Sequence, residues 1–388
     1  MSSQINTLEV INLFSSAKIF IGSQFSYLTD HGINMHLICS PHEELDDFAR
    51  DQKIKDYQAI QLNRQLTPFK DLLALYKICK FIKKNQINTI IGHQPKGTLL
   101  TVLAGKIMRV PNIILFAHGT FYETETGIKK VLFVNLDRFL SRFSNKIVCV
   151  SQFVVNIRKE LKIDKPGKCV MLGSGTCGGI DTKLNFNPEL IDFKESESLK
   201  LKLGLKPNDF VIGFVGRLVR DKGIVELIEA YKILKEKHKM RSFKLLLVGD
   251  FELRDSVPQQ YIDFIRNEKD IILTGFVNSE IELYYSMMNT LILPSYRDGF
   301  GLSLIEASSM KVPVLASKIT GCVNAVSEGV SGYFVDLSGA GIAEGIEKMF
   351  DPDLRFDLGS KGREWVSANF DHTVVWPHML SLLQNRAV

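Results

Sequence analysis

The chain has 388 residues, of which 45% are hydrophobic and 23% are charged. This length exceeds that of one ordinary domain, and this balance excludes a disordered or fibrous protein. The six cysteines include no Cys-x-x-Cys pair, which argues against a zinc site or a disulfide framework. No run of 18 apolar residues could span a membrane, and Glu9 interrupts the apolar stretch near the N-terminus, so we expect a cytoplasmic protein without a signal peptide.

Positive charge is concentrated in the first half of the sequence. Residues 1–183 contain 24 Lys/Arg against 15 Asp/Glu, whereas residues 184–388 contain 24 against 28. A basic half favours an anionic partner such as lipid head groups, a diphosphate or nucleic acid. An ordinary solvated surface is the alternative interpretation.

The apolar pattern of the first half alternates short β-rich runs with longer helical segments. Strands are predicted at 7–13, 35–40, 59–62, 89–93, 112–118, 146–151 and 168–172. Helices are predicted at 23–29, 68–85, 97–108, 129–143 and 152–161. Strands separated by helices of this length are typical of βαβ units with a parallel sheet.

The second half repeats this alternation. Strands are predicted at 211–215, 243–248, 271–274, 290–293, 314–317 and 332–335. Helices are predicted at 223–237, 258–267, 279–288, 302–310, 340–350 and 352–368. The polar, turn-prone segment 185–203 is interpreted as the join between two domains.

The fold class is therefore predicted to be α/β, with two Rossmann-like, doubly wound domains. Their predicted limits are 1–185 and 204–370, and residues 371–388 are expected to return towards the first domain. Ligand crevices of such domains lie at the carboxyl ends of the strands, and we expect both to face an interdomain cleft.

A glycine-rich loop with two cations follows the strand predicted at 211–215. Gly216 allows a ligand to approach the backbone closely. Arg217 and Lys222 lie just before a helix, whose free N–H groups and dipole favour an anion. This combination suits a diphosphate, although a surface loop with incidental charges is the alternative.

A second glycine-rich loop follows the strand predicted at 290–293 and leads into a helix near Leu302. Asp298 could hold hydroxyls of a sugar, and Glu306 could accept both hydroxyls of a ribose. Backbone and side chains near them are also expected to contact the donor: Gly299, Phe300, Gly301, Leu302 and Ser303. A solvated helix face is the alternative for Glu306, but its neighbours are apolar, and a buried acid needs a partner.

Two motifs are rejected as binding sites. The spacing G-x-G-x-x-G occurs at 173–178, but the long helix that a dinucleotide fingerprint requires does not follow. The run Asp351-Pro352-Asp353 has the spacing of a metal-binding Asp-x-Asp, but it lies between two predicted helices. We interpret this run as a helix cap.

Three motifs of the second half together resemble the GT-B glycosyltransferases of family 4. They are G-R-L-x-x-x-K-G at 216–223, an acidic-x7-Glu element at 298–306, and the run at 313–335 that contains P-V-L-A-S and G-V-S-G-Y-F-V. The resemblance implies that Arg217 and Lys222 hold the diphosphate of a nucleotide sugar. It also implies that Glu306 holds the ribose and Asp298 the transferred sugar. The family usually has Glu at the position of Asp298, which leaves the identity of the sugar open.

The first half resembles a subgroup of this family that builds bacterial surface polysaccharides. The matching elements are L-N-R-Q at 62–65 with Pro68, H-Q-P-K-G at 93–97, A-H-G at 117–119, G-S-G-T at 173–176 and G-I-D at 179–181. The resemblance implies that a neutral His118 hydrogen-bonds a hydroxyl of the donor sugar. Lys96 and His118 are expected to contact the acceptor, with Lys96 meeting an anionic group such as a lipid diphosphate.

The resemblance implies a retaining transfer of a hexose or N-acetylhexosamine, most simply from a UDP-linked donor, to a polyprenyl-diphosphate-linked saccharide. Arg217 and Lys222 would stabilise the leaving diphosphate with His118 and Asp298 beside the sugar, so we expect no metal and no other cofactor. We expect no nucleic acid partner. A nucleotide-sugar epimerase on the same scaffold and a non-catalytic sugar-binding subunit are the alternatives.

The segments at 69–84 and 129–143 mix apolar and basic side chains. Such helices either lie on an anionic membrane or pack their apolar faces on the sheet. We expect packing for most of their surface and lipid contact for part of the basic rim. The protein is then peripheral on the cytosolic face of the inner membrane.

Overall fold

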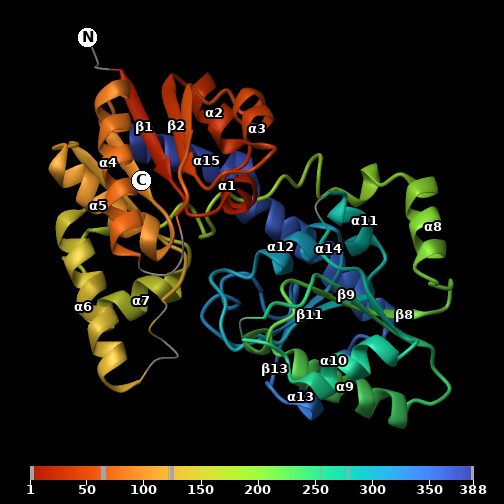
Figure 1. The fold of residues 1–388 in the computed structure, drawn as a ribbon. Helices are drawn as coiled ribbons and strands as arrows, with labels where there is room; N and C mark the ends of the chain where they lie inside the picture. The colour runs from red at the N-terminus through yellow and green to blue at the C-terminus, as the bar shows by residue number, and fades with distance from the viewer. Residues whose placement is uncertain are drawn as a thin grey trace. The chain divides into compact units, whose positions relative to one another are not determined.

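The structure is a computed structural model that describes residues 4–62, 67–120, 122, 126–253, 255–277 and 279–385. Residues 63–65 of the L-N-R-Q match lie outside these described residues. The chain divides into two compact units (Figure 1). Unit 1 consists of Met1–Gly179 and His372–Val388, and unit 2 consists of Ile180–Asp371.

Unit 1 is built on a parallel sheet, to which the described residues contribute seven strands in the order β3-β2-β1-β4-β5-β6-β7. The strands are β1 (Ile5–Val10), β2 (Ile33–Cys39), β3 (Asp56–Ala59), β4 (Thr89–Gly92), β5 (Asn112–Ala117), β6 (Lys146–Cys149) and β7 (Cys169–Val170). The direction of the strand order reverses between β1 and β4. In doubly wound sheets ligands bind at the carboxyl ends of the strands at such a reversal.

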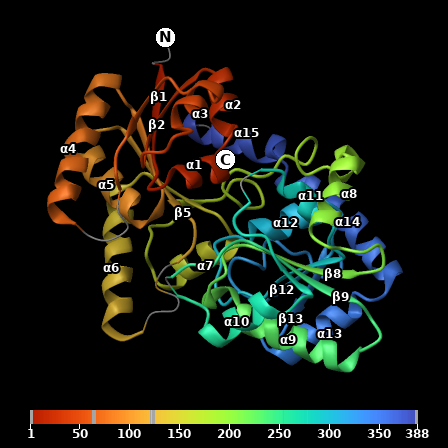
Figure 2. The same ribbon diagram turned by 45° about the vertical axis from the view of Figure 1, so that its right-hand side comes forward.

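Helices cover both faces of this sheet. They are α1 (Phe14–Phe20), α2 (Gln24–Asp30), α3 (Leu45–Asp51), α4 (Pro68–Asn85), α5 (Gln94–Ile107), α6 (Gly127–Phe143), α7 (Gln152–Glu160) and α15 (His372–Leu383). Figures 1 and 2 show α4 and α5 on one face of β1 and β2, and α2 and α15 on the other. The inner side of α4 buries Ala74, Ile78 and Phe81, which recur at helical spacing and belong to the core.

The last helix completes unit 1 from the far end of the chain. The Trp376 indole N–H of α15 donates to the Gly178 carbonyl oxygen at 2.6 Å, and its ring lies 5.2 Å from that of Tyr27 on α2. The C-terminal segment of the chain is therefore part of the same compact unit as its N-terminal residues.

Unit 2 has a parallel sheet of the same design. Its described strands follow the order β10-β9-β8-β11-β12-β13. They are β8 (Phe210–Val215), β9 (Phe243–Val248), β10 (Ile271–Leu273), β11 (Thr290–Leu293), β12 (Val314–Ser317) and β13 (Gly332–Val335). The reversal of direction here lies between β8 and β11. Both glycine-rich loops start at the carboxyl ends of these two neighbouring strands.

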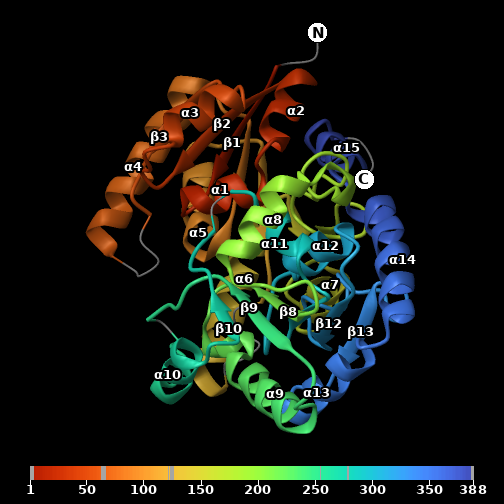
Figure 3. The same ribbon diagram turned by 90° about the vertical axis from the view of Figure 1, so that its right-hand side faces the viewer.

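The helices of unit 2 pack in pairs, α9 beside α13 and α12 beside α14 (Figure 3). The helical segments are η1 (Pro188–Leu190), α8 (Phe193–Lys202), η2 (Arg220–Lys222), α9 (Ile224–Lys237), α10 (Gln259–Asn267), α11 (Ile281–Ser286), α12 (Leu302–Ser309), α13 (Gly339–Lys348) and α14 (Pro352–Phe370). Across the ranges that the structure describes, no helix is both long and apolar enough to cross a membrane.

The predicted secondary structure is wrong in some places. The join at 185–203 contains α8, which begins at an N-cap: the Asp192 carboxylate accepts the backbone N–H groups of Lys194 and Glu195. The strand predicted at 59–62 is wrong, because Ile60 and Leu62 lie in the core after β3 has ended. The short helices α1 and α3 were not predicted, and neither was α15.

Both rejected motifs have a structural explanation. The Asp351 side chain accepts the backbone N–H groups of Asp353 and Leu354 and caps α14, as predicted. The segment 173–181, all of it described, contains no helix, which confirms that the G-x-G-x-x-G spacing there is not a dinucleotide fingerprint.

Arg363 on α14 ties together three segments of unit 2. Its guanidinium donates to the carbonyl oxygens of Thr182 at 3.0 Å, Phe186 at 3.0 Å and Ser309 at 2.6 Å, and to Asn187 Oδ1 at 3.0 Å. One planar guanidinium group therefore donates to four acceptors on these segments at once.

Replacing Arg363 by Lys should lower the free energy of unfolding by about 1–3 kcal/mol, because one ammonium group cannot reach acceptors on all sides. The change is measured by chemical denaturation. Lys361→Ala on the same helix is the control: its ion pair with Asp357 is half-exposed, so its effect should stay below about 0.5 kcal/mol. Equal destabilisation by both variants would contradict the role given to Arg363.

Candidate functional site

The two glycine-rich loops of unit 2 are packed on each other. Gly223, which ends the first loop, has φ +70°, and a Cβ there would lie 1.8 Å from the Pro294 carbonyl oxygen. A hydrogen bond from the Tyr296 N–H to the Asp221 carbonyl oxygen at 2.8 Å joins the loops further along. Only glycine fits at position 223, so this contact depends on the absence of a side chain.

The contact between the loops brings Lys222 against Asp298. The Lys222 ammonium lies 2.5 Å from the Asp298 carboxylate, and both side chains are largely buried. Burial alone would raise the pKa of Asp298. The charge and hydrogen bond of Lys222, together with the amides of Gly301 and Gly299, instead lower it below its ordinary value. Asp298 is therefore an ionised, paired carboxylate at neutral pH.

Glu306 lies on α12 and has a partner that was not predicted from sequence. The Tyr285 hydroxyl of α11 donates to Glu306 Oε2 at 2.6 Å. Burial raises the pKa of Glu306 to about 7, although the Tyr285 hydrogen bond opposes the rise. This carboxyl group therefore changes its charge within the physiological pH range.

The other residues predicted to contact the donor differ in how available they are. Arg217 is half-exposed, with Nη1 2.9 Å from Glu252 Oε2. Phe300 is buried and packs edge-on against Phe370, with 5.3 Å between ring centroids. The Phe300 side chain is thus part of the core, and only its backbone remains for a ligand.

The backbone of this loop surrounds the start of α12. Gly301 has φ +69°, and its N–H donates to Asp298 Oδ1 at 3.2 Å. Leu302 and Ser303 form the first turn of α12 and are partly buried. Gly216, at the end of β8, has φ +150° and lies in the other loop. The structure thus groups the predicted residues on two adjoining loops, and their roles towards a ligand stay predictions.

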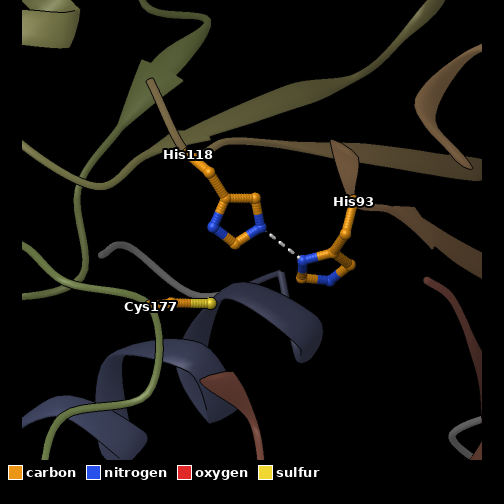
Figure 4. Close-up of side chains that lie close together, drawn as sticks. All are labelled: His93, His118 and Cys177. Carbon is orange, nitrogen blue, oxygen red and sulfur yellow. Dashed lines mark hydrogen bonds between the residues drawn. The ribbon is translucent and has the colours of Figure 1, made fainter. Parts of the chain in front are cut away.

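In unit 1, a line of polar side chains crosses three neighbouring strands. Glu9 on β1 lies opposite Ile91 on β4, so His93, two residues further, lies on the same face of the sheet. His118 follows β5, the next strand, and lies two residues beyond the neighbour of His93. His93 Nε2 is 2.7 Å from Glu9 Oε2. His93 Nδ1 is 2.8 Å from His118 Nε2, the link drawn as a dashed line in Figure 4.

Burial dominates the electrostatics of this line. Glu9 and His93 are 1% and 2% exposed, and His118 is partly buried. Burial raises the pKa of Glu9 well above its ordinary value and lowers the pKa of His93 to about 3. Burial, with the nearby His93, also lowers the pKa of His118 well below its ordinary value. His118 is therefore neutral at physiological pH.

Lys96, predicted to meet an anionic acceptor, already has an acidic neighbour. It is 5% exposed, and its ammonium lies 2.7 Å from Asp71 Oδ1 on α4. The Asp71 carboxylate also accepts from the backbone N–H and hydroxyl of Thr67. An anionic acceptor would have to compete with this buried pair, and the predicted role of Lys96 stays untested.

The partners that hold these residues were not predicted from the sequence. Glu9 had a visible signal, because it is the one charged residue in the strand predicted at 7–13. Tyr285 and Cys177 had none, since they approach Glu306 and the histidines only through the fold. His93 could have been found from its position at the end of a strand next to that of His118.

Within the described part of unit 1, His93, His118 and Cys177 lie close enough together to be compared with a metal site. Their ligand atoms all lie within 4.8 Å of one another, and Figure 4 shows the three side chains together. A zinc ion would lie about 2.0–2.3 Å from each of its ligand atoms. In the structure the two histidine nitrogens instead face each other directly, as a hydrogen-bonded pair.

Comparison with known proteins covers both units. Residues 195–365 match the family described as "Glycosyl transferases group 1", and residues 9–151 match the one described as "Glycosyl transferase 4-like". The chain is 30% identical over 361 residues to the capsular polysaccharide biosynthesis glycosyltransferase CapM of Staphylococcus aureus, and the match covers 92% of each chain.

Two further proteins are similar over most of their length. The chain is 26% identical over 337 residues to the UDP-Gal:alpha-D-GlcNAc-diphosphoundecaprenol alpha-1,3-galactosyltransferase of Escherichia coli, covering 86% of this chain and 84% of the relative. The solved structure of HepE of Anabaena, in complex with UDP and glucose, matches with a TM-score of 0.81 at 17% identity. That match covers 98% of this chain and 100% of HepE.

Two doubly wound units with this strand order place the protein in the GT-B fold class, and the likeness to HepE supports this. The sequence matches are more specific. The chain belongs to the GT-B glycosyltransferases of family 4 and is a glycosyltransferase. The predicted fold class and family are thereby confirmed.

The raised pKa of Glu306 predicts how the stability of the folded protein depends on pH. Its folded-state pKa of about 7 lies above the ordinary value of 4.5, so the folded state loses stability relative to the unfolded state as pH rises from about 4.5 to about 7. Glu306→Gln cannot ionise and escapes this loss. Its melting temperature relative to the native protein should therefore be higher at pH 8 than at pH 5.

Tyr285→Phe is the matched variant for this measurement. Removing the hydroxyl removes the hydrogen bond that lowers the pKa of Glu306, so the loss of stability should extend to higher pH. Thermal unfolding in buffers from pH 5 to pH 9 tests both variants. An equal difference between Glu306→Gln and the native protein at every pH would disprove the buried, raised-pKa state of Glu306.

Proposed function

We propose that this glycosyltransferase moves a hexose or N-acetylhexosamine from a UDP-linked donor to a polyprenyl-diphosphate-linked saccharide during assembly of a surface polysaccharide. The observation that carries the proposal is the Lys222–Asp298 pair on two loops at the reversal point of the unit 2 sheet. The name of the Escherichia coli relative includes a UDP-linked donor and a diphosphoundecaprenol-linked sugar. The Staphylococcus aureus relative is named for capsular polysaccharide biosynthesis.

Lys222 and Asp298 are proposed to exchange partners when the donor binds. In the structure the two groups neutralise each other at 2.5 Å. A diphosphate brings more negative charge than Asp298 and offers the Lys222 ammonium stronger hydrogen bonds. Asp298 is then free to accept from a sugar hydroxyl, which suits the role that the family resemblance gives it. Arg217 can also turn to the diphosphate, because breaking its half-exposed ion pair with Glu252 costs little free energy.

Glu306 is proposed to hold the ribose. Its Oε2 accepts from Tyr285, which fixes the carboxyl group in one orientation. Ribose hydroxyls donate hydrogen bonds and therefore favour the ionised carboxylate, so donor binding should lower the pKa of Glu306 from about 7. The proton released by the protein would be a direct sign of this contact.

Transfer is proposed to proceed with retention of configuration and without a metal. Lys222 and Arg217 stabilise the charge that develops on the departing diphosphate, where one well-placed group contributes about 3 kcal/mol. The departing diphosphate accepts the proton of the attacking hydroxyl on the same face of the sugar. His118 holds a sugar hydroxyl as a neutral imidazole.

The exposed face of α6 is proposed to bind a membrane surface that contains anionic lipid. Its inner face buries Val134 and Leu140, whereas Ile128, Val131 and Leu132 are 86%, 59% and 66% exposed. Lys129 and Lys130 lie between these apolar side chains. Apolar insertion together with positive charge fits a lipid-linked acceptor presented at the cytosolic face of a membrane.

Lys222→Met should lower kcat/KM for sugar transfer by about 100-fold or more, because the leaving group loses its cation. Donor and acceptor are identified first, by incubating a panel of UDP-sugars with a polyprenyl-diphosphate-linked saccharide and weighing the products by mass spectrometry. Lys244→Met is the control, since Lys244 forms a similarly buried ion pair with Asp270 in the same unit but away from both loops.

Near-native transfer by Lys222→Met, with Lys244→Met equally active, would refute the role of Lys222. Each donor is also incubated without acceptor. A new nucleotide sugar formed under those conditions would favour the epimerase alternative. Absence of transfer with every UDP-sugar, but transfer from another nucleotide sugar, would correct the choice of base.

The α6 face can be tested with vesicles. The native protein should sediment with vesicles that contain phosphatidylglycerol and much less with phosphatidylcholine alone. Lys129→Gln/Lys130→Gln should weaken this binding at least about tenfold, since each basic side chain near an anionic surface contributes about 1 kcal/mol. Phe356→Ser, which removes an apolar side chain 78% exposed on α14, is the control and should bind normally. Identical sedimentation of all three proteins would rule out α6 as the lipid-binding face.

A further inference from the structure

A chain of two hydrogen bonds joins Glu9 to His93 and His93 to His118. Through this chain, the protonation of Glu9 determines which nitrogen of His118 carries a hydrogen. The two links are 2.7 Å and 2.8 Å long. A neutral imidazole has one N–H and one lone pair. Each neutral histidine therefore donates at one nitrogen and accepts at the other. As a result, the donor–acceptor direction of the Glu9–His93 hydrogen bond also fixes the direction of the His93–His118 hydrogen bond.

Two arrangements satisfy both links without leaving a carboxyl O–H unpaired, since a proton on Glu9 Oε1 would find no partner among the described residues. If Glu9 is ionised, it accepts from His93 Nε2–H, His93 Nδ1 accepts from His118 Nε2–H, and His118 Nδ1 is left with a lone pair. If Glu9 is protonated, it donates to His93 Nε2, His93 Nδ1–H donates to His118 Nε2, and His118 Nδ1 carries the hydrogen. Figure 4 shows this second nitrogen of His118 pointing away from His93.

The surroundings of Glu9 favour the protonated arrangement. Glu9 Oε1 is buried and has no hydrogen-bond partner among the described residues. The titratable groups facing Glu9 there are His93 and the Cys177 thiol, and neither supplies positive charge: burial lowers the pKa of His93 to about 3 and raises that of Cys177. An ionised carboxylate with one bare oxygen and no cation would be costly at this depth.

The ring of His118 is held in place by aromatic neighbours. Phe20 stacks on it with 5.3 Å between centroids, and Phe116 with 5.7 Å. The ring therefore keeps Nε2 towards His93. Whether Nδ1 donates or accepts a hydrogen bond then depends only on whether Nδ1 carries the ring hydrogen.

We propose that Glu9 is a positioning residue which, through His93, holds His118 in the Nδ1–H form, so that His118 presents a hydrogen-bond donor to the sugar. This inference rests on the proposed function for the identity of the ligand, but not for the state of the ring. It also excludes His118 Nδ1 as the base in the reaction. An imidazole that carries its hydrogen at Nδ1 cannot accept a proton there, so the proton of the attacking hydroxyl has to leave by another route.

Long-range ¹H–¹⁵N correlation spectra of the full-length chain, labelled with ¹⁵N-histidine, read the form of each ring directly. His93→Gln and His118→Gln variants assign the signals. The native protein should show His118 protonated at Nδ1, and so should Glu9→Gln, because an amide can donate to His93 Nε2 as a protonated carboxyl does. Glu9→Leu has no donor and should shift His118 towards the Nε2–H form.

Kinetics supply a second readout. Glu9→Leu should lower kcat for transfer about tenfold or more, the effect of one misdirected hydrogen bond, and Glu9→Gln should restore most of it. At high pH, Glu9 in the native protein ionises and His118 should change form, whereas Glu9→Gln should not follow. This pH comparison needs no destabilising variant and holds even if Glu9→Leu fails to fold.

Three results would overturn the proposal. They are an Nε2–H form of His118 in the native protein at neutral pH, an unchanged His118 signal in folded Glu9→Leu, and one zinc ion per purified chain that is lost in Cys177→Ser. In the last case a metal, not a proton, joins the two histidines. The spectra are recorded without donor or acceptor, so failure of the transfer assay leaves this test intact.

Discussion

The close approach of Gly223 to the Pro294 carbonyl oxygen is the constraint on which the unit 2 loops depend. Parallel strands β8 and β11 deliver the two loops to the same edge of the sheet. The missing side chain at Gly223 then lets them touch, which puts Lys222 against Asp298 in a largely buried setting. Because the pair is neutral as a whole, both charges can be buried together where the loops touch, and Lys222 still offers a cation to a diphosphate.

The fold could be predicted furthest where a segment is buried on all sides. Three such strands of unit 2, β9, β11 and β12, have the predicted limits. The partly buried edge strand β13 also has them. Other edge and polar elements were harder. β3 is a half-exposed edge strand, and α8 is a charged helix whose start depends on the Asp192 cap and not on an apolar stripe. Periodicity carries no signal for such elements.

The candidate site divides in a similar way. Residue types that bind phosphate or ribose are visible in sequence, because glycines, cations and carboxylates occur at fixed spacing after strands. The partner of each group is not visible, since Tyr285 lies 21 residues from Glu306 and Glu9 lies 84 from His93. Burial sets the charge that Glu9, His93 and Glu306 carry at neutral pH. Both the burial and the partners arise only in the three-dimensional structure.

The discontinuous make-up of unit 1 has a consequence for synthesis on the ribosome. Unit 2 is one continuous stretch, Ile180–Asp371, and can fold as soon as it emerges. The sheet of unit 1 emerges first. The face of the sheet that carries α2 is completed only when α15, with Trp376, has been made. At about 5–20 residues per second, the intervening residues take roughly 10–40 seconds to make. During that interval the nascent chain exposes an uncovered apolar face, which is the kind of surface that chaperones bind.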